Sequence, residues 1–193
     1  EALGQELGFD ARKAELASDE VGVFSSSRVR ALLAEGDVGA ASAVLGRPHA
    51  VAGVVAPGKR LGRTLGFPTA NLAEVREVLP RPGIYAVLVD LVEPGGARAL
   101  AKGAMSIGTN PTTDGQEAEP SGAGDQPLKA EVFLLDFEGD LYGKRLRVGF
   151  VRRLRSEQRF DSLDALVVQM NHDVTASRAL LADAAPLPPP PGA

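Results

Sequence analysis

The sequence feature that most constrains the fold is a series of short apolar segments separated by glycine and proline. They cover residues 49–55, 83–92, 97–107, 129–137 and 144–154. Apolar segments of this length, bounded by turn residues, are typical of β-strands. Because no helical pattern lies between them, the sequence favours a mainly β fold, an antiparallel barrel or sandwich, over a parallel sheet.

The residues between these segments predict how the strands connect. Glu93-Pro94-Gly95-Gly96 is a turn sequence that should close a hairpin between the second and third segments. In the same way, Glu138-Gly139-Asp140 should join the fourth segment to the fifth. The last two strands are therefore expected to pair with each other.

Two short helices are expected before the first strand. Residues 25–36 begin with serines that can act as the N-cap, and Gly36 can end the helix. Asp37 can cap a second helix, which Gly46 would end. These two helices form a leader that should pack on whatever follows it.

One long helix is predicted over residues 161–183, with Asp161 or Ser162 as its N-cap. Apolar residues recur along it at helical spacing and are expected to form a single buried stripe. The stripe consists of Leu163, Leu166, Val167, Met170, Val174 and Leu181.

These patterns divide the chain into three parts. Residues 1–48 form the helical leader, residues 49–183 the barrel with its C-terminal helix, and residues 184–193 a proline-rich tail that we expect to be disordered. Within the second part, residues 109–127 are polar and low in apolar residues, so this insert is expected to be mobile.

Composition excludes several classes of protein. The formal net charge of −4 and the absence of tryptophan argue against a general nucleic-acid binder. No apolar run is long enough to cross a bilayer, so no membrane partner is expected. The chain has no cysteine, which rules out disulfides and thiolate metal sites and fits a cytoplasmic protein. Self-association stays open.

The stretch from residue 58 to residue 72 is the candidate ligand-binding segment. Gly58, Gly62 and Gly66 leave the backbone free to approach a ligand, and basic side chains lie among them. Thr69 and Asn71 then project to the same side if the segment is extended, and both offer neutral oxygen donors. Such a stretch is typical of a phosphate–Mg²⁺ cradle, although a plain hairpin connection has the same composition. The spacing of a P-loop is absent.

The run from Gly62 to Leu72, GRTLGFPTANL, closely resembles the signature of riboflavin kinases, including its Pro-Thr-Ala-Asn core. Residues 106–112, 131–144 and 154–163 resemble the same family in the same order. Together these motifs span residues 47–181, most of the chain. The resemblance implies a six-stranded, Greek-key-like antiparallel barrel. It also implies a riboflavin kinase, which transfers the γ-phosphoryl group of ATP to riboflavin to give FMN and ADP.

The resemblance implies a role for individual residues. Glu131 corresponds to the catalytic base, and Thr69 with Asn71 to the Mg²⁺ ligands. Arg155 and Glu157 lie in the segment that the family places near the flavin. The ATP site would consist of Gly58, Gly62, Arg63, Gly66, Phe67, Pro68, Thr69 and Asn71.

The residues around Glu131 leave its role open without the resemblance. Strand alternation puts it beside apolar neighbours, where partial burial would raise its pKa and suit it as a base. By position alone it is equally a solvated strand residue. The family has a second flap over the substrates in the region of residues 109–127, usually with an aromatic residue where this chain has Thr113.

Residues 25–48 resemble the end of the adenylyltransferase module of bacterial bifunctional FAD synthetases, beginning with Ser25-Ser26-Ser27-Arg28. The paired-histidine motif of that module is absent, because the only histidines are His49 and His172. We therefore expect this chain to be a fragment that lacks the N-terminal module and its adenylyltransferase activity. The alternative to a kinase is a catalytically silent barrel that binds flavin or a nucleotide, or an assembly module for the missing part.

Overall fold

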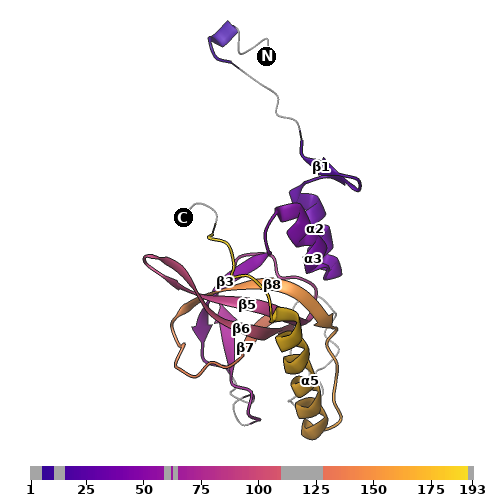
Figure 1. Ribbon diagram of the computed structural model, residues 1–193, viewed down its shortest axis with the longest axis vertical. Helices are drawn as coiled ribbons and strands as arrows, with labels where there is room; N and C mark the ends of the chain where they lie inside the picture. The colour runs from indigo at the N-terminus through magenta and orange to yellow at the C-terminus, as the bar shows by residue number, and fades with distance from the viewer. Residues whose placement is uncertain (1–5, 11–15, 59–61, 63–64, 110–127, 191–193) are drawn as a thin grey trace.

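The computed structural model describes residues 6–10, 16–58, 62, 65–109 and 128–190. Arg63, Thr113 and residues 110–127 of the insert lie outside the described residues. The described part contains a closed six-stranded antiparallel barrel, flanked by helices and preceded by a small hairpin (Figure 1). The barrel strands are β3 (Ala50–Ala56), β4 (Thr69–Ala73), β5 (Gly83–Glu93), β6 (Gly96–Gly108), β7 (Lys129–Leu134) and β8 (Arg145–Arg155). This architecture confirms the predicted mainly β fold.

The strand order around the barrel is β3-β4-β7-β6-β5-β8, and β8 closes onto β3. The predicted hairpin between β5 and β6 is present, with Glu93 opposite Gly96. The predicted pairing of the last two strands is wrong, because β7 pairs with β4 and β6 whereas β8 pairs with β3 and β5. The reason is β4: this short, partly polar strand was not among the predicted segments, and it occupies the edge of β7 that a hairpin would have given to β8.

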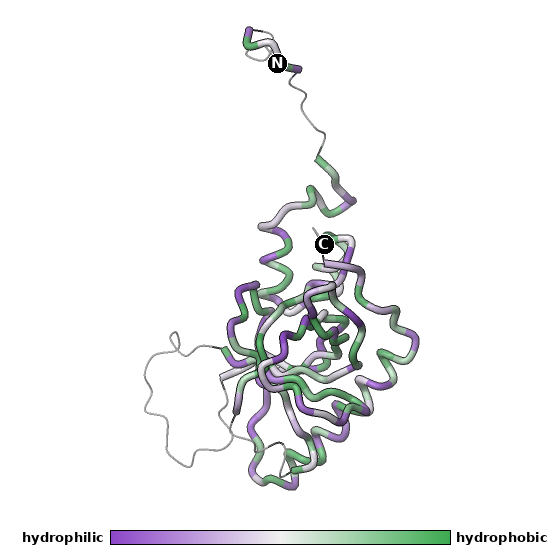
Figure 2. The backbone as a smooth tube through the Cα atoms, turned by 90° about the vertical axis from the view of Figure 1, so that its left-hand side faces the viewer, coloured by the Kyte–Doolittle hydropathy of each residue, from purple (hydrophilic) through white to green (hydrophobic). Residues whose placement is uncertain are grey.

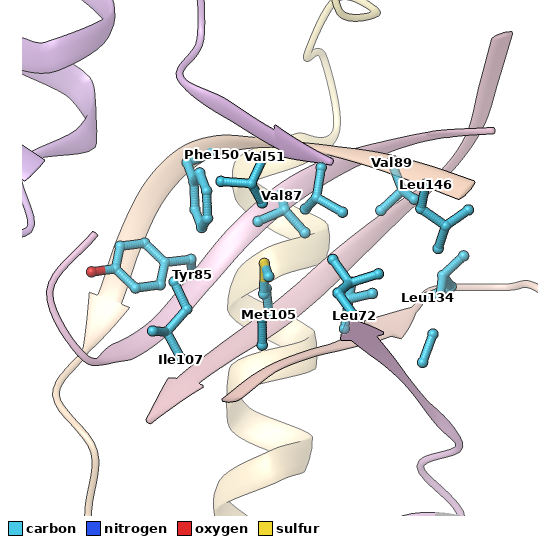
Figure 3. Close-up of a cluster of buried hydrophobic side chains, with 14 of the residues drawn as sticks. Val51, Leu72, Tyr85, Val87, Val89, Met105, Ile107, Leu134, Leu146 and Phe150 are labelled. Atoms are coloured by element: carbon cyan, nitrogen blue, oxygen red, sulfur yellow. The ribbon is translucent and has the colours of Figure 1, made fainter. Parts of the chain in front are cut away.

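The barrel interior is filled by one face of each strand. Burial alternates along β3, β4 and β7, as period-two strands require. Tyr85 and Phe150 meet edge to face with their ring centroids 5.3 Å apart, and the Tyr85 hydroxyl donates to the carbonyl of Arg81. Figure 3 shows the side chains that fill the interior, among them Val51, Leu72, Val87, Met105, Ile107 and Leu146.

The leader helices share this core. They are α2 (Ser26–Glu35) and α3 (Val38–Leu45), and their predicted caps are present at Ser25, Gly36, Asp37 and Gly46. Leu33, Val38 and Ala41 are buried in the same cluster as the barrel interior. The backbone N–H of Arg81, just before β5, donates to the carbonyl of Leu33 at 2.8 Å.

None of the described residues before α2 belongs to this core cluster. The hairpin of β1 (Ser18–Asp19) and β2 (Gly22–Val23) lies at the far end of α2 from the barrel, as two perpendicular views show (Figures 1 and 2). Arg28 of α2 holds it, donating to both carboxylate oxygens of Asp19 at 2.8 Å. No helix within the described ranges is long and apolar enough to cross a membrane.

The long helix α5 (Leu163–Leu181) runs along the outside of the barrel, with Ser162 as its N-cap (Figure 1). The predicted apolar stripe is confirmed in part, because Leu181 is buried and Leu166, Val167, Met170 and Val174 are half-buried. Asp173, Ser177 and Leu181 are the buried residues of the helix, while the side chain of Leu163 is 50% exposed. The helix contacts the barrel in two ways: Asp173 forms an ion pair with Arg155 of β8, and Leu181 packs in an apolar cluster with Ala86 and Leu88 of β5.

The chain after α5 also lies against the barrel, where we expected disorder. Leu187 packs in an outer apolar cluster with Leu88 and Leu181. A Cβ placed on Gly149 would lie 2.3 Å from Leu187 Cδ2, so the missing side chain at residue 149 makes room for the leucine. Arg147 donates to the carbonyl of Pro188 at 2.7 Å. Residues 191–193 lie outside the described residues.

Because Leu33 is buried in the barrel core, we expect Leu33→Ala to lower the free energy of unfolding by about 2–5 kcal/mol. The loss would combine the transfer free energy of the removed methyl groups with the cavity left behind. Urea denaturation followed by circular dichroism measures it. Leu163→Ala is the matched control, and an equal loss in both variants would show that the leader is not part of the core.

We expect stability to fall as pH is lowered from about 7 to about 5. His49 stacks on Phe150 and its Nε2 donates to the Val78 carbonyl at 2.8 Å. Burial lowers the pKa of His49 below its ordinary 6.5. The folded state therefore binds fewer protons than the unfolded chain in this range. The contribution of His49 to stability is fully present above pH 6.5, and it is lost as the pH falls toward the pKa of His49 in the folded state. Urea midpoints against pH should show a flatter slope for His49→Gln than for His172→Gln.

Candidate functional site

Three of the predicted site residues, Thr69, Asn71 and Glu131, meet on the outer face of the barrel, where β4 and β7 pair. Asn71 lies opposite Glu131, and Thr69 lies opposite Phe133. Directly opposed residues project from the same face of a sheet, and the inward positions belong to Ala70, Leu72 and Val132. The Thr69 hydroxyl donates to Glu131 Oε2 at 3.3 Å. Pairing of the two strands thus brings together residues that lie 62 positions apart in the chain.

A pocket of about 650 Å³ opens beside these residues. One wall comes from the glycine-rich stretch and β4, through Gly58, Pro68, Thr69 and Asn71. The other wall is the connection between β7 and β8, from Phe137 to Tyr142. Glu131 does not line the pocket, but it touches Thr69, which does. The threonine therefore links the pocket to the carboxylate.

Close backbone packing shapes the glycine-rich stretch. A Cβ on Gly58 would lie 2.2 Å from Asn71 Nδ2, so only glycine leaves the amide of Asn71 in place. Phe67 N–H donates to the Gly62 carbonyl at 2.7 Å, which folds the chain back before β4. Gly66 has a φ of 84°, a conformation that favours glycine. The Phe67 ring is buried against Phe133, with centroids 5.4 Å apart.

The donors at this pocket suit a divalent cation that keeps most of its other ligands. Thr69 and Asn71 offer a hydroxyl and an amide oxygen from the same wall. Within the described residues no group of three or more histidines, cysteines, aspartates or glutamates could hold a metal. A few neutral oxygens are what Mg²⁺ uses when water and phosphate oxygens complete its octahedron. The residues present therefore fit a phosphate-bound Mg²⁺.

Arg155 is the last residue of β8 and Glu157 follows two residues later; neither lines the pocket. The guanidinium of Arg155 is engaged by Asp173 of α5, with Nη2 2.6 Å from Oδ2. The carboxyl of Glu157 lies over Gly108, the last residue of β6. Burial raises the pKa of Glu157, and the nearby Arg155 partly offsets that rise.

Sequence reasoning missed the wall from Phe137 to Tyr142. The sequence predicts only a hairpin turn at Glu138-Gly139-Asp140, because a polar turn sequence does not show which part of the fold it faces. Asp136, just before this wall, has a φ of 54° and lies in the turn that follows β7. The signal that could have found the wall was the family resemblance, which continues without a gap through residues 131–144.

Known proteins resemble this chain over most of its length. The family model of flavokinase, described as riboflavin kinase, matches residues 45–181. The bifunctional riboflavin kinase/FMN adenylyltransferase of Pseudomonas fluorescens is 42% identical over 182 residues, which cover 94% of this chain and 54% of that protein. The protein of the same description from Escherichia coli K12 is 38% identical over 175 residues, which cover 91% of this chain and 51% of that protein. The chain thus spans about half the length of these relatives.

A solved structure has a similar fold. It is a crystal structure described as a macrolide-efflux protein from Streptococcus pneumoniae, with a TM-score of 0.74 and 31% sequence identity. The match covers 91% of this chain and 53% of that one.

Proposed function

This chain belongs to the riboflavin kinase family, and we propose that it transfers the γ-phosphoryl group of ATP to the 5′-hydroxyl of riboflavin, giving FMN and ADP. The observation that carries the proposal is the contact between Thr69 and Glu131 beside the pocket. It puts an oxygen donor for a phosphate-bound cation next to a carboxylate that can take a proton.

In this proposal Glu131 is the general base. The 5′-oxygen attacks the γ-phosphorus, the bond to the β–γ bridging oxygen breaks, and ADP leaves with that electron pair. Glu131 accepts the proton that the hydroxyl loses. Its position on the middle of three paired strands, between Asn71 of β4 and Ser106 of β6, supports this role because substrates can approach from both sides.

The pocket is the proposed site of ATP. Backbone N–H groups of the glycine-rich stretch face the phosphates, with Gly58, Gly62, Gly66, Phe67 and Pro68 setting its shape. Thr69 and Asn71 would hold Mg²⁺, and the bound cation would offset the charge of the phosphate oxygens. Arg63, outside the described residues, is proposed as a further cation for the phosphates. A filled pocket also keeps out water that would otherwise hydrolyse ATP.

Riboflavin is proposed to lie on the other side of Glu131. Gly108 of β6 pairs with Lys129, two residues before Glu131, and Glu157 lies over Gly108. A carboxylate there can accept hydrogen bonds from the N–H group of a flavin ring or from ribityl hydroxyls. Flavin on this side and nucleotide in the pocket would bring the 5′-hydroxyl and the γ-phosphate together at Glu131.

The two bacterial relatives are described as bifunctional. We propose that this chain alone carries the kinase activity without the adenylyltransferase activity. Ser25 accepts the α2 capping bond, and Arg28 is paired with Asp19 and the Gly22 carbonyl. These residues thus have structural partners within the leader.

The first test is to incubate the chain with riboflavin, ATP and Mg²⁺ and to follow flavins by chromatography. We expect FMN to form, no FAD to form, and EDTA to stop the reaction because the phosphates lose their counter-ion. FAD from added FMN would contradict the proposed lack of adenylyltransferase activity. Riboflavin binding without FMN would favour the silent-barrel alternative.

The second test is Glu131→Gln, which keeps the size of the side chain and removes the base. We expect kcat to fall by about 10²–10⁴-fold, with the Kd for riboflavin nearly unchanged. Stopped reactions and fluorescence titration measure the two quantities. Glu93→Gln, which removes an exposed carboxylate at the β5–β6 turn, is the control. Unchanged turnover in Glu131→Gln would remove Glu131 from the mechanism.

A further inference from the structure

Most of the hydrogen-bond donors of the Arg155 side chain already bind acceptors within the protein. Its Nε lies 2.8 Å from Oδ1 and 3.1 Å from Oδ2 of Asp173, and its Nη2 lies 2.6 Å from Oδ2. Gln169, one turn earlier on α5, donates to the same carboxylate at 3.0 Å. Asp173 is only 7% exposed. The carboxylate thus neutralises the guanidinium, so Arg155 offers little net charge to a ligand.

Ser156, which follows Arg155, accepts hydrogen bonds from two arginines of β8. Arg155 Nη1 donates to the Ser156 carbonyl at 3.0 Å. Arg153 Nη2 donates to the Ser156 hydroxyl at 3.2 Å and to the Pro82 carbonyl at 2.8 Å. Phe160 also faces the guanidinium of Arg155, 5.9 Å from its ring centroid. These contacts fix the direction in which the chain leaves β8.

Glu157 ends this chain of contacts, and its carboxyl lies directly against the backbone of β6. A Cβ on Gly108 would lie 1.6 Å from Oε1, 2.1 Å from Cδ and 2.6 Å from Oε2 of Glu157. All three atoms belong to one flexible side chain, so a methyl group at residue 108 would displace the carboxyl and leave the strand in place. Glycine at residue 108 is therefore what lets Glu157 occupy this position.

We propose that Asp173 and Gly108 are positioning residues for riboflavin: Asp173 holds the β8 exit through Arg155, Gly108 leaves room for the carboxyl, and Glu157 makes the contact with the flavin. The inference rests on the proposed function. It assigns Arg155 to holding the chain, and it connects α5 to substrate binding. The specific consequence is that riboflavin affinity depends on a buried ion pair that does not line the nucleotide pocket.

The barrel contains a matched ion pair that serves as the control. Asp90 of β5 is 3% exposed and pairs with Arg147 of β8 at 2.5 Å. The partner arginine is on the same strand as Arg155, and the pair is as buried as Asp173–Arg155. Asp90→Asn therefore also removes a buried carboxylate that is paired with an arginine, but at the part of the barrel where the C-terminal chain packs.

The experiment compares Asp173→Asn, Gly108→Ala and Asp90→Asn in the full chain. For Asp173→Asn and Gly108→Ala we expect the Kd and KM for riboflavin to rise about tenfold to a hundredfold, because the contacting group is displaced, while the KM for ATP stays within about twofold. Asp90→Asn should lower the melting temperature as Asp173→Asn does, without changing either KM. If Asp173→Asn and Asp90→Asn have the same Kd and KM for riboflavin, the proposed role of Asp173 is overturned.

A double-mutant cycle shows whether both residues act through Glu157. Once Glu157→Ala has removed the carboxyl, adding Asp173→Asn or Gly108→Ala should raise the riboflavin Kd by less than about twofold further. Full additivity would overturn the proposal. If Asp173→Asn fails to fold, the cycle between Gly108 and Glu157 still decides whether Glu157 is the contacting group.

Failure of the inference can be told from failure of the proposed function. The Kd for riboflavin is measured by fluorescence without ATP, so it tests positioning even in a chain with no turnover. A wild-type chain that binds no riboflavin would refute the proposed function and the inference together. A wild-type chain that makes FMN, with variants that bind riboflavin normally, would refute the inference alone.

Discussion

Closure of the barrel through β4 is the constraint on which the site depends. β4 is only five residues long, yet it pairs with β3 on one side and β7 on the other. Its inward residues, Ala70 and Leu72, join the core, so its outward residues must project from the surface. Thr69 and Asn71 are these outward residues, and the register with β7 sets them beside Glu131. A shift by one residue would turn all of them inward.

Two ion pairs add to the apolar contacts that hold α5 and the C-terminal chain on the barrel. Asp90–Arg147 and Asp173–Arg155 are buried ion pairs that join β8 to β5 and to α5. Burying charges costs desolvation energy that the attraction repays only when the geometry is good, and both pairs have more than one hydrogen bond. Asp173 thereby ties α5 to the end of β8, and Arg147 also donates to the Pro188 carbonyl of the C-terminal chain.

The leader helices complete the hydrophobic core instead of standing beside it. Leu33, Val38 and Ala41 contribute side chains to the cluster that fills the barrel. A Cβ on Gly36, at the end of α2, would lie 2.7 Å from Arg153 Cδ, so the end of the helix packs closely against Arg153, near the end of β8. The same arginine holds Ser156, and the leader is thus in contact with the segment that we propose orients Glu157.

The sequence by itself determined the local features: the helix caps at Gly36, Asp37 and Gly46, the β5–β6 hairpin, and the alternation that puts Thr69 and Asn71 on one face. These depend on residues close together in the chain, so spacing reveals them. The partners of each strand were decided only by tertiary structure, because β4 is too short and polar to be recognised before its pairing is known. The same holds for Asp173 on Arg155 and for Glu157 on Gly108, because each contact joins residues from different elements of the fold.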